Sequence, residues 1–239
     1  DLILIGRAFS KSQIRTIKIP SKVINIKFGT FSECTSLRKV EFEENSNLET
    51  IGTFSFAGSG IRSLQFPSKL EKLEKRWCFD SSFLTSITIS PDNKHFAFID
   101  EKLIGRKSNQ ENFFYDDLVF ALRDVKTVFI PSYIKKIKSC TFSDCVNLKK
   151  VVFSDDSQLV SIGKESFSGC GLKSLSIPQK IRKIKKEAFI CAEIETVEIL
   201  GDDVLLGVDC FNSSDLRLIS FPNAQKVVIY DNTFIFSSD

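Results

Sequence analysis

The sequence contains no methionine, one tryptophan, one histidine and no long apolar run. No stretch approaches the ~20 consecutive apolar residues that a membrane-spanning helix needs. The opening residues DLILIGRAFS also lack the cationic start and long apolar centre of a signal peptide. We therefore expect no membrane span in this chain. Because it begins at Asp1 without methionine, we expect a segment excised or processed from a longer protein.

Residues for catalysis and cofactor binding are also scarce. His95 has no recognisable serine or cysteine nucleophile motif around it, and the 11 glycines are scattered, so none forms the phosphate-binding pattern G-x-G-x-x-G. The net charge of +3 is too small to indicate a nucleic acid partner, and basic residues are not interleaved with aromatic ones. These absences predict a chain that is not an enzyme, holds no cofactor and binds no nucleic acid.

The seven cysteines form no C-x-x-C pair, and CTFSDC at 140–145 lacks the second pair or histidine partner of a zinc site. Cys34, Cys145 and Cys170 each stand three residues after a recurring phenylalanine, which favours small buried packing residues. An odd count leaves at least one thiol free. We expect free, buried thiols, because a chain with a large core does not need disulfides for stability.

Phenylalanine is abundant, with 23 residues, and its spacing reveals a repeat. Seven phenylalanines and one cysteine form a series with steps of 22 or 25 residues and a single gap of 64. An apolar residue stands five positions before most of these anchors. The anchors are Phe9, Phe31, Phe56, Cys78, Phe142, Phe167, Phe189 and Phe211.

After each anchor comes a motif of the form L-x-x-L-x-L, such as LKSLSI at 172–177. Its alternating end predicts a short strand with apolar residues on one face. All six prolines stand one or two positions after such a strand, where a residue without an amide donor is tolerated. One turn cannot bury its own apolar residues, but stacked turns can.

These patterns predict an α/β repeat solenoid built from leucine-rich repeats of about 22–25 residues. We expect a parallel β-sheet on its concave side and short 3₁₀ or irregular arms on its convex side. Residues 1–239 are predicted to form a single solenoid, which a divergent hairpin and loop segment interrupts at about 91–129. Within this segment the cluster Phe113, Phe114 and Tyr115 has two interpretations: a plug for the ladder or an exposed binding knob.

The pattern IP-x-x-I-x-x-I-x-x-x-x-F-x-x-C-x-x-L-x-x-V-x-F, from Ile130 to Phe153, resembles the BspA-like leucine-rich repeats of bacterial surface antigens and parasitic protists. The resemblance extends over nearly the whole chain. It implies a cell-surface or secreted module for adhesion, or for binding host, matrix or microbial surface proteins. Two features depart from the pattern: Cys78 replaces an anchoring phenylalanine, and VVIYDNTFIFSSD at 227–239 loses the spacing.

Two other functions remain open from the sequence alone. The first is an intracellular scaffold in the cytoplasm that joins protein partners, which free cysteines and the missing signal peptide favour. The second is an accessory or regulatory domain of an enzyme in a longer chain.

Two surfaces are candidates for binding. The first is the concave sheet face, formed by the residues between the apolar ones of each motif. It is polar and mixed in charge, which suits a protein interface or a plain solvated face. The predicted face comprises Thr16, Lys18, Lys39, Glu41, Ser63, Gln65, Ser86, Thr88, Lys150, Val152, Ser174, Ser176, Thr196 and Glu198.

The second is a basic stripe in equivalent arms of different turns. It is either a solvated outer face or a site that attracts sulfated glycans or an anionic membrane. The stripe comprises Lys135, Lys136, Lys138, Lys180, Arg182, Lys183, Lys185 and Lys186.

Overall fold

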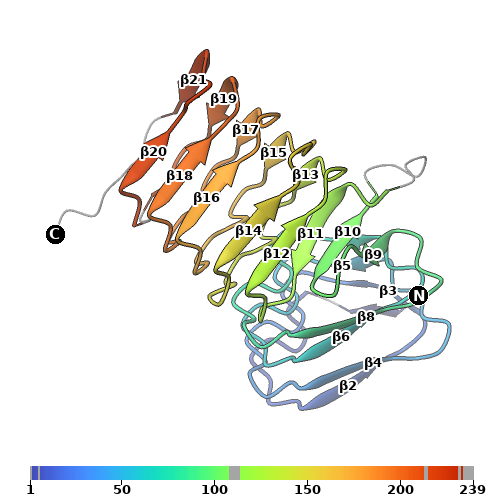
Figure 1. The fold of residues 1–239 in the computed structure, drawn as a ribbon. Helices are drawn as coiled ribbons and strands as arrows, with labels where there is room; N and C mark the ends of the chain where they lie inside the picture. Colours follow the sequence, from blue (N-terminus) through green and yellow to red (C-terminus); the bar gives the residue numbers. More distant parts are fainter. Residues whose placement is uncertain (1, 5, 108–113, 213–214, 231–232, 234–239) are drawn as a thin grey trace. The chain divides into compact units, whose positions relative to one another are not determined.

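The computed structural model describes residues 2–4, 6–107, 114–212, 215–230 and 233. Its internal contacts divide the chain into two compact units, residues 1–98 (unit 1) and 99–239 (unit 2). Each unit is described by itself. In both, consecutive repeat turns stack on one another, as the colour order in Figure 1 shows.

Unit 1 carries parallel strands on two sides of each turn. One side, the sheet face, has four-residue strands that pair as β2 with β4 and β6 with β8. The other, the arm side, has shorter strands in the order β1-β3-β5-β7. The sheet-face strands are β2 (Thr16–Ile19), β4 (Lys39–Phe42), β6 (Ser63–Phe66) and β8 (Ser86–Ile89). The arm strands are β1 (Leu2–Leu4), β3 (Val23–Ile26), β5 (Thr50–Ile51) and β7 (Lys72–Leu73), and β9 (Phe96–Phe98) ends the unit.

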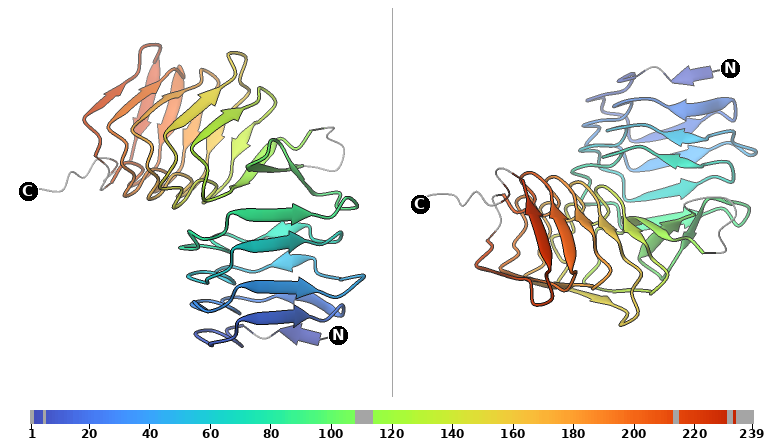
Figure 2. Two further views of the ribbon diagram at one scale, coloured as in Figure 1. Left: turned by 60° about the horizontal axis from the view of Figure 1, so that its bottom comes forward. Right: turned by 90° about the horizontal axis from the view of Figure 1, so that it is seen from above.

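Unit 2 repeats this two-sided arrangement, which the views in Figure 2 show from two further directions. Its sheet face consists of β12 (Thr127–Ile130), β14 (Lys150–Phe153), β16 (Ser174–Ile177), β18 (Thr196–Ile199) and β20 (Leu218–Ser220). Its arm strands are β10 (Leu103–Arg106), β11 (Asp117–Ala121), β13 (Lys136–Ile137), β15 (Ser161–Ile162), β17 (Lys183–Ile184), β19 (Asp203–Leu206) and β21 (Lys226–Ile229). All arm pairs from β11 to β21 are parallel, whereas β10 and β11 are antiparallel.

The alternation in the L-x-x-L-x-L motif fixes these sheet-face strands. In β16, Leu175 and Ile177 are buried while Ser174 and Ser176 are exposed. Leu175 pairs in register with Val197 of the next turn, so apolar residues meet apolar residues along the solenoid. Pro178 directly follows the strand and ends it, because proline has no amide to donate to the sheet.

The phenylalanine anchors form a ladder inside each unit, as the spacing predicts. In unit 2 the rings of Phe142, Phe167, Phe189 and Phe211 stack with centroid distances of 4.9, 5.0 and 5.0 Å. In unit 1, Phe9, Phe31 and Phe56 stack at 5.4 and 5.2 Å. Stacking and burial of one large ring per turn add to the contacts that the buried Leu, Ile and Val side chains make between turns.

The expectation of 3₁₀ arms and an α/β class is wrong, and the fold is a parallel β-solenoid of leucine-rich repeats. Within the described residues there is no helix. In the anchor turn the Phe31 amide donates to the Ser55 carbonyl of the next turn at 2.7 Å, whereas the Ser32 amide bonds to Gly29 within its own turn at 3.1 Å. Because alternate amides bond between turns, the consecutive i to i−3 bonds of a 3₁₀ helix cannot form.

In each anchor turn that the structure describes in full, this alternation requires left-handed backbone at two positions, two residues before and two after the anchor. Gly29 and Glu33 flank Phe31 with φ of 59° and 56°, and Glu187 and Cys191 flank Phe189 with φ of 58° and 54°. Such positions are costly for residues other than glycine. We refer to the side of each unit that these anchor turns form as the turn side.

The substitution at Cys78 is compensated by its neighbour. Trp77 is 5% exposed and meets Phe56 edge to face at 6.4 Å, so it continues the aromatic ladder in unit 1. Phe66 packs on Trp77 at 6.1 Å and on Phe96 at 5.6 Å. Buried Asn93 closes this end of the unit, since its side-chain amide donates to the carbonyls of Pro67 and Leu70 at 2.7 and 2.9 Å.

The divergent segment at 91–129 contains β9, β10 and β11. Asp100 fixes the turn before β10, where its Oδ1 accepts hydrogen bonds from the amides of Lys102 and Leu103, both at 2.8 Å. In the aromatic cluster, Phe113 lies outside the described residues. Phe114 is 59% exposed but stacks on Tyr133 at 4.9 Å, and Tyr115 is half-buried.

The thiols follow the prediction except at one position. Cys34, Cys145, Cys170 and Cys210 are free and buried, and Cys78 and Cys140 are also buried. Burial raises the pKa of both Cys170 and Cys210 to about 12. Cys191 is free and exposed, at the left-handed position two residues after its anchor.

Candidate functional site

The sheet face of unit 1 brings the predicted residues into rows along the solenoid. Ser63 lies in register with Ser86, and Gln65 with Thr88. A hollow of about 490 Å³ lies over these strands, and its lining includes Lys18, Lys39, Glu41, Ser63, Gln65 and Thr88. The predicted Thr16 is in register with Lys39 beside it.

Three of the side chains that line this hollow are charged: Lys18, Lys39 and Glu41. The Lys39 ammonium forms an ion pair with Glu41 two residues along the same strand. Its hydrogen bond and charge lower the pKa of the Glu41 carboxyl. Because the pair is exposed, it contributes little to stability and leaves both groups within reach of a partner.

The sheet face of unit 2 forms two similar rows. One runs from Ser174 through Thr196 to Leu218, and the other from Ser176 through Glu198 to Ser220. The Ser176 hydroxyl donates to Glu198 Oε2 at 2.9 Å. A hollow of about 340 Å³ lies over β16, β18 and β20.

Two apolar residues on this face were not among the sequence-predicted site residues. Phe129 is 53% exposed and lies in register with Val152, and Leu218 is 59% exposed at the last described strand of the face. Both stand at outward positions of their strands, in TVFI and LRLISF, where most other repeats have a polar residue and Val152 is a further exception. An apolar residue at an outward strand position is the sequence feature that would have identified Phe129 and Leu218 as site residues.

The basic stripe lies on the arm side of unit 2. Lys136 and Lys183 are in register with Ser161 between them, and both are exposed. Within the described part of the chain, no acidic side chain lies within ion-pair distance of either one. These two lysines are therefore the least neutralised members of the stripe.

Most other stripe charges have partners. Lys135 and Lys138 pair with the buried carboxylates of Asp116 and Asp117 at 3.3 and 3.2 Å. Arg182 pairs with Asp202 at 2.8 Å, and Lys180 donates to Gln158 Oε1 at 2.6 Å. At Lys185, just after β17, the main chain is held by a hydrogen bond from its amide to the Ile162 carbonyl at 3.0 Å.

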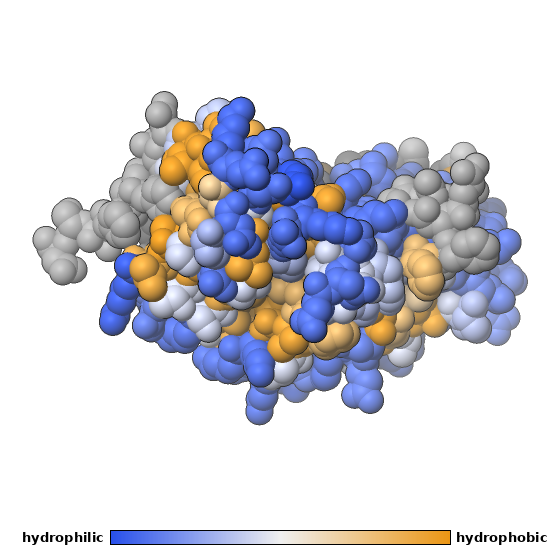
Figure 3. Space-filling model, turned by 45° about the horizontal axis from the view of Figure 1, so that its top comes forward, coloured by the Kyte–Doolittle hydropathy of each residue, from blue (hydrophilic) through white to orange (hydrophobic). Residues whose placement is uncertain are grey.

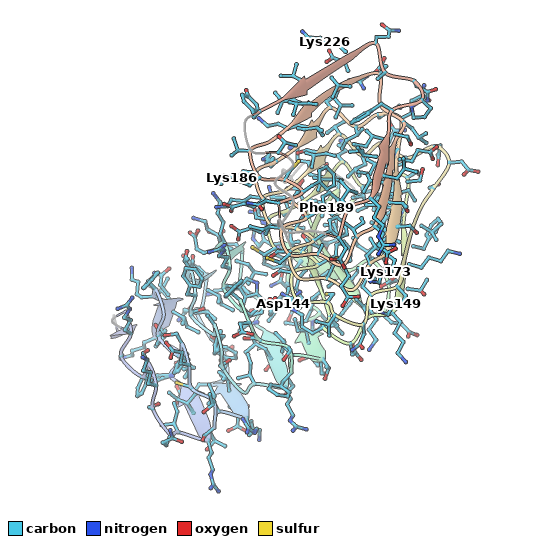
Figure 4. All side chains as sticks on the ribbon, turned by 90° about the vertical axis from the view of Figure 1, so that its left-hand side faces the viewer. Asp144, Lys149, Lys173, Lys186, Phe189 and Lys226 are labelled. Atoms are coloured by element: carbon cyan, nitrogen blue, oxygen red, sulfur yellow. The ribbon has the colours of Figure 1, made fainter. Side chains whose placement is uncertain are left out.

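Lys186 belongs to an ion-pair network at the turn side of unit 2. It contacts Glu187 at 3.2 Å, and Lys164 contacts the same carboxylate at 3.1 Å. Burial alone would raise the pKa of Glu187, but hydrogen bonding with Glu165, Lys164 and Lys186 outweighs it and lowers this pKa to about 2. Figure 4 shows Phe189 inside the turns, with Lys186 on one side and Lys149 and Lys173 on the opposite side.

The single histidine, His95, contributes to a structural turn. His95 Nε2 lies 4.0 Å from Glu71, and its amide donates to Asn93 Oδ1 at 2.9 Å, so it belongs to the closing turn of unit 1. Within the described residues, no group of three or more His, Cys, Asp or Glu side chains is placed to hold a metal ion.

The surface of the molecule mixes polar and apolar areas. Figure 3 shows apolar areas among polar ones on one face, and Leu218 and Ile229 in the last strands of unit 2 are more than half exposed. Among the residues for which the structure gives a position, none forms a helix with the length and apolarity of a membrane span.

Comparison with solved structures supports the fold. The chain is similar to a leucine-rich cell surface protein of Faecalibacterium prausnitzii, with a TM-score of 0.66 and 23% identity, over 89% of this chain and 61% of that one. It is also similar to the pneumococcal vaccine antigen PcpA, with a TM-score of 0.64 and 18% identity, over 98% and 62%. A leucine-rich repeat protein of Bacteroides ovatus matches with a TM-score of 0.55 and 17% identity, over 97% and 65%.

This chain thus spans less than two thirds of the length of each of these three proteins. No match was found among curated proteins. The sequence itself matches the family described as BspA type leucine rich repeat region, in six copies over residues 5–113 and 114–239. Together with the stacked turns and the anchor ladder, this match shows that the chain belongs to the BspA-type leucine-rich repeat family.

Proposed function

We propose that this chain is a non-catalytic protein-binding module that acts at a cell surface and recognises its partner through the sheet face. One observation carries the proposal: the sheet face of each unit is hollowed and lined by exposed side chains in register. On the arm side of unit 2, by contrast, most charges are already satisfied within the chain. Solenoids use such extended faces for recognition.

The chemistry of the sheet face in unit 2 favours a protein partner. Small hydroxyl side chains such as Ser174 and Thr196 form hydrogen bonds in many orientations, and Lys150 and Glu198 add one charge of each sign. Phe129 and Val152 supply an apolar anchor at one side of these rows. A desolvated aromatic anchor surrounded by polar residues is the usual composition of a protein interface.

The surface location is supported by what the similar proteins are. One is named as a cell surface protein and another as a vaccine antigen. Partners of this class are proteins on host cells, in the extracellular matrix or on other microbes. Adhesion through such partners is the specific form of the function that we propose.

An intracellular scaffold is the second candidate. The observation that favours it is the set of free thiols, including exposed Cys191, since secreted proteins commonly oxidise such residues. The sheet face would serve the same purpose there, with a cytosolic protein as the partner.

The arm side of unit 2 offers a second, less supported binding site, a pair of lysines that would attract anions. Lys136 and Lys183 would attract sulfated glycans, and retention on heparin at low salt measures this directly. If the Lys136→Glu/Lys183→Glu variant is not retained, and added salt releases the wild type, the attraction between these lysines and heparin is electrostatic. No retention at low salt contradicts it.

The experiment that tests the main proposal is binding of the labelled chain to epithelial cells and immobilised matrix proteins across a salt series. We expect saturable binding that persists at physiological salt and falls about tenfold or more in Phe129→Ala, since truncation of an anchor typically removes that much affinity. Phe83→Ala is the matched control, because Phe83 is 58% exposed and lies outside the proposed face. Equal loss in both variants, or no binding, contradicts the proposal, and binding only to cytosolic proteins supports the scaffold instead.

A further inference from the structure

Basic side chains gather on the sheet face of unit 1 and at the edge where its strands begin. An arginine stands directly before each of β2, β4 and β6, and all three arginines are exposed. We call Arg15, Arg38 and Arg62 the edge row. Lys18 and Lys39 add two exposed ammonium groups on the strands themselves. Because β2, β4 and β6 follow one another along the unit in Figure 1, the five groups form one surface.

Most of these charges are not neutralised within the chain. Lys39 forms its ion pair with Glu41. Arg15, Lys18 and Arg62, by contrast, have no acidic side chain within ion-pair distance in the part of the chain that the structure describes. Exposed cations without an internal partner are available to a carboxylate from outside.

The arginine in the middle of the edge row is held in place. Arg38 Nη1 donates to the carbonyls of Thr35 and Gly60 at 2.6 and 3.2 Å. It also donates to the Leu37 carbonyl at 3.0 Å. These acceptors are neutral, so the guanidinium keeps its charge. A charge that is already fixed loses less conformational freedom when a partner binds.

The acidic side chains beside this surface do not balance it. The strands β2, β4, β6 and β8 carry one carboxylate, Glu41, and Glu43 stands directly after β4. Glu43 accepts a hydrogen bond from the Ser21 amide at 2.9 Å. Five basic side chains minus these two carboxylates leave an excess of three positive charges, as large as the net charge of +3 of the whole chain. A partner with negative charge is complementary to this surface.

The charge decreases along the face from β2 to β8. The outward residues of β6 and β8 are neutral: Ser63 is in register with Ser86, and Gln65 with Thr88. Before β8, Thr85 takes the place that arginine has in the preceding turns. The hollow of about 490 Å³ extends over both the charged and the neutral strands. A ligand that matches it is negative at one end and has uncharged hydrogen-bonding groups at the other.

The length of the face fits a short peptide. Four strands are separated by three spacings of about 4.8 Å, or about 14 Å in all, which an extended peptide covers in about four or five residues. Hydroxyl and amide side chains can donate to peptide carbonyls and accept from peptide amides. A sulfated glycan, which carries negative charge along its whole length, would place sulfates against Glu41 and over the neutral strands.

We propose that the sheet face of unit 1 binds an acidic segment of a partner protein, in which Asp or Glu residues lie over β2 and β4 and uncharged polar residues lie over β6 and β8. This inference rests on the proposed function, because it takes the sheet face as the binding surface, and it adds the chemistry of the partner. The guanidinium groups of Arg15 and Arg62 can each bind a carboxylate through two hydrogen bonds.

The test is fluorescence anisotropy of the full chain with two rhodamine-labelled peptides, EEDSTSG and its uncharged counterpart QQNSTSG, at low and at physiological salt. We expect saturable binding of EEDSTSG that is about tenfold or more tighter than that of QQNSTSG. Neutralisation of two cations in Arg15→Gln/Lys18→Gln should weaken the binding of EEDSTSG by about tenfold or more. Both side chains are exposed, so the melting temperature of this variant should equal that of the wild type.

Lys22→Gln/Lys27→Gln is the matched control, since it removes the same charge from exposed lysines on either side of the arm strand β3. It should bind EEDSTSG as the wild type does. Equal losses in the two double variants, equal affinity for both peptides, or no binding of EEDSTSG overturns the proposal. Tighter binding of a heparin-derived oligosaccharide that Arg15→Gln/Lys18→Gln weakens also overturns it, and identifies a sulfated glycan as the ligand.

The proposed function and this inference can fail separately. Phe129 lies in unit 2, so Phe129→Ala should leave the binding of EEDSTSG unchanged. If the chain binds cells and loses that binding in Phe129→Ala, but does not bind EEDSTSG, the proposed function stands and the acidic segment is refuted. If EEDSTSG binds as described but cells and matrix proteins do not, the chemistry of the sheet face stands and the proposed adhesion is refuted.

Discussion

Truncation of Phe189 to alanine should destabilise unit 2 by about 3–5 kcal/mol. The ring is fully buried and stacks on Phe167 and Phe211, both with centroids 5.0 Å away. Its removal leaves a cavity that the neighbouring turns cannot fill, because the anchor turns are held by hydrogen bonds such as that from the Phe189 amide to the Cys210 carbonyl at 2.8 Å. Two stacking contacts are lost at the same time, each worth about 0.5–1.5 kcal/mol beyond the area buried.

Urea denaturation followed by circular dichroism measures this loss. Phe189→Leu retains much of the volume and should lose less, about 1–2 kcal/mol. Phe129→Ala removes an exposed ring of the same unit and should change stability by no more than about 0.5 kcal/mol. A loss under about 1 kcal/mol for Phe189→Ala would refute the ladder as the main support of the turns.

Three further predictions follow from the buried and strained groups. A thiol reagent applied to the folded chain should modify Cys191 alone, as mass spectrometry would show, and fast reaction of Cys170 would contradict its burial. Because the pKa of Glu187 lies below its usual 4.5, the stabilisation by its carboxylate should be present above pH 4.5 and lost as the pH falls towards 2. Glu187→Gln should therefore be less stable than the wild type at pH 7 and equally stable near pH 2. A difference in the free energy of unfolding that does not change across this range would be inconsistent with that pKa. Gly171→Ala would place a Cβ 2.0 Å from the Val146 carbonyl oxygen and should cost about 2 kcal/mol in urea denaturation, and a loss below about 0.5 kcal/mol would show that the backbone yields there.

The ladder and the sheet-face strands could be predicted from the sequence because each depends on a local, repeated pattern. Phe167, Leu175 and Pro178 recur at fixed offsets, and each offset corresponds to one physical role: ring stacking, strand burial or strand end. Because the pattern recurs in several turns, single departures such as Cys78 do not obscure it. One turn with the same residues would not distinguish a strand from another apolar segment.

The arms were harder to predict, because their structure depends on hydrogen bonds between turns. The motif Lys183–Ile184 is too short to show strand periodicity, and only its pairing with Ser161–Ile162 of the previous turn makes it a strand. Likewise, the repeat pattern showed Cys78 only as a departure, because Trp77, which fills the ladder, stands one residue before the anchor position.

The candidate sites show the same division. The outward residues of β6, β8, β16 and β18 follow from strand alternation and lie in rows as expected. The ion pairs of the basic stripe could not be predicted. The partner of Lys135 is Asp116, which lies in the divergent segment, where no repeat offset predicts a contact.

The most direct test of the sheet-face proposal is lysine footprinting of the chain while it is bound to epithelial cells. Lys39 and Lys150 point outward from the sheet face, and Lys136 and Lys183 point outward from the arm side. The proposal predicts that binding slows acetylation of Lys39 and Lys150 and leaves Lys136 and Lys183 unchanged. Protection of Lys136 and Lys183 alone would contradict it and would identify the arm side as the binding surface.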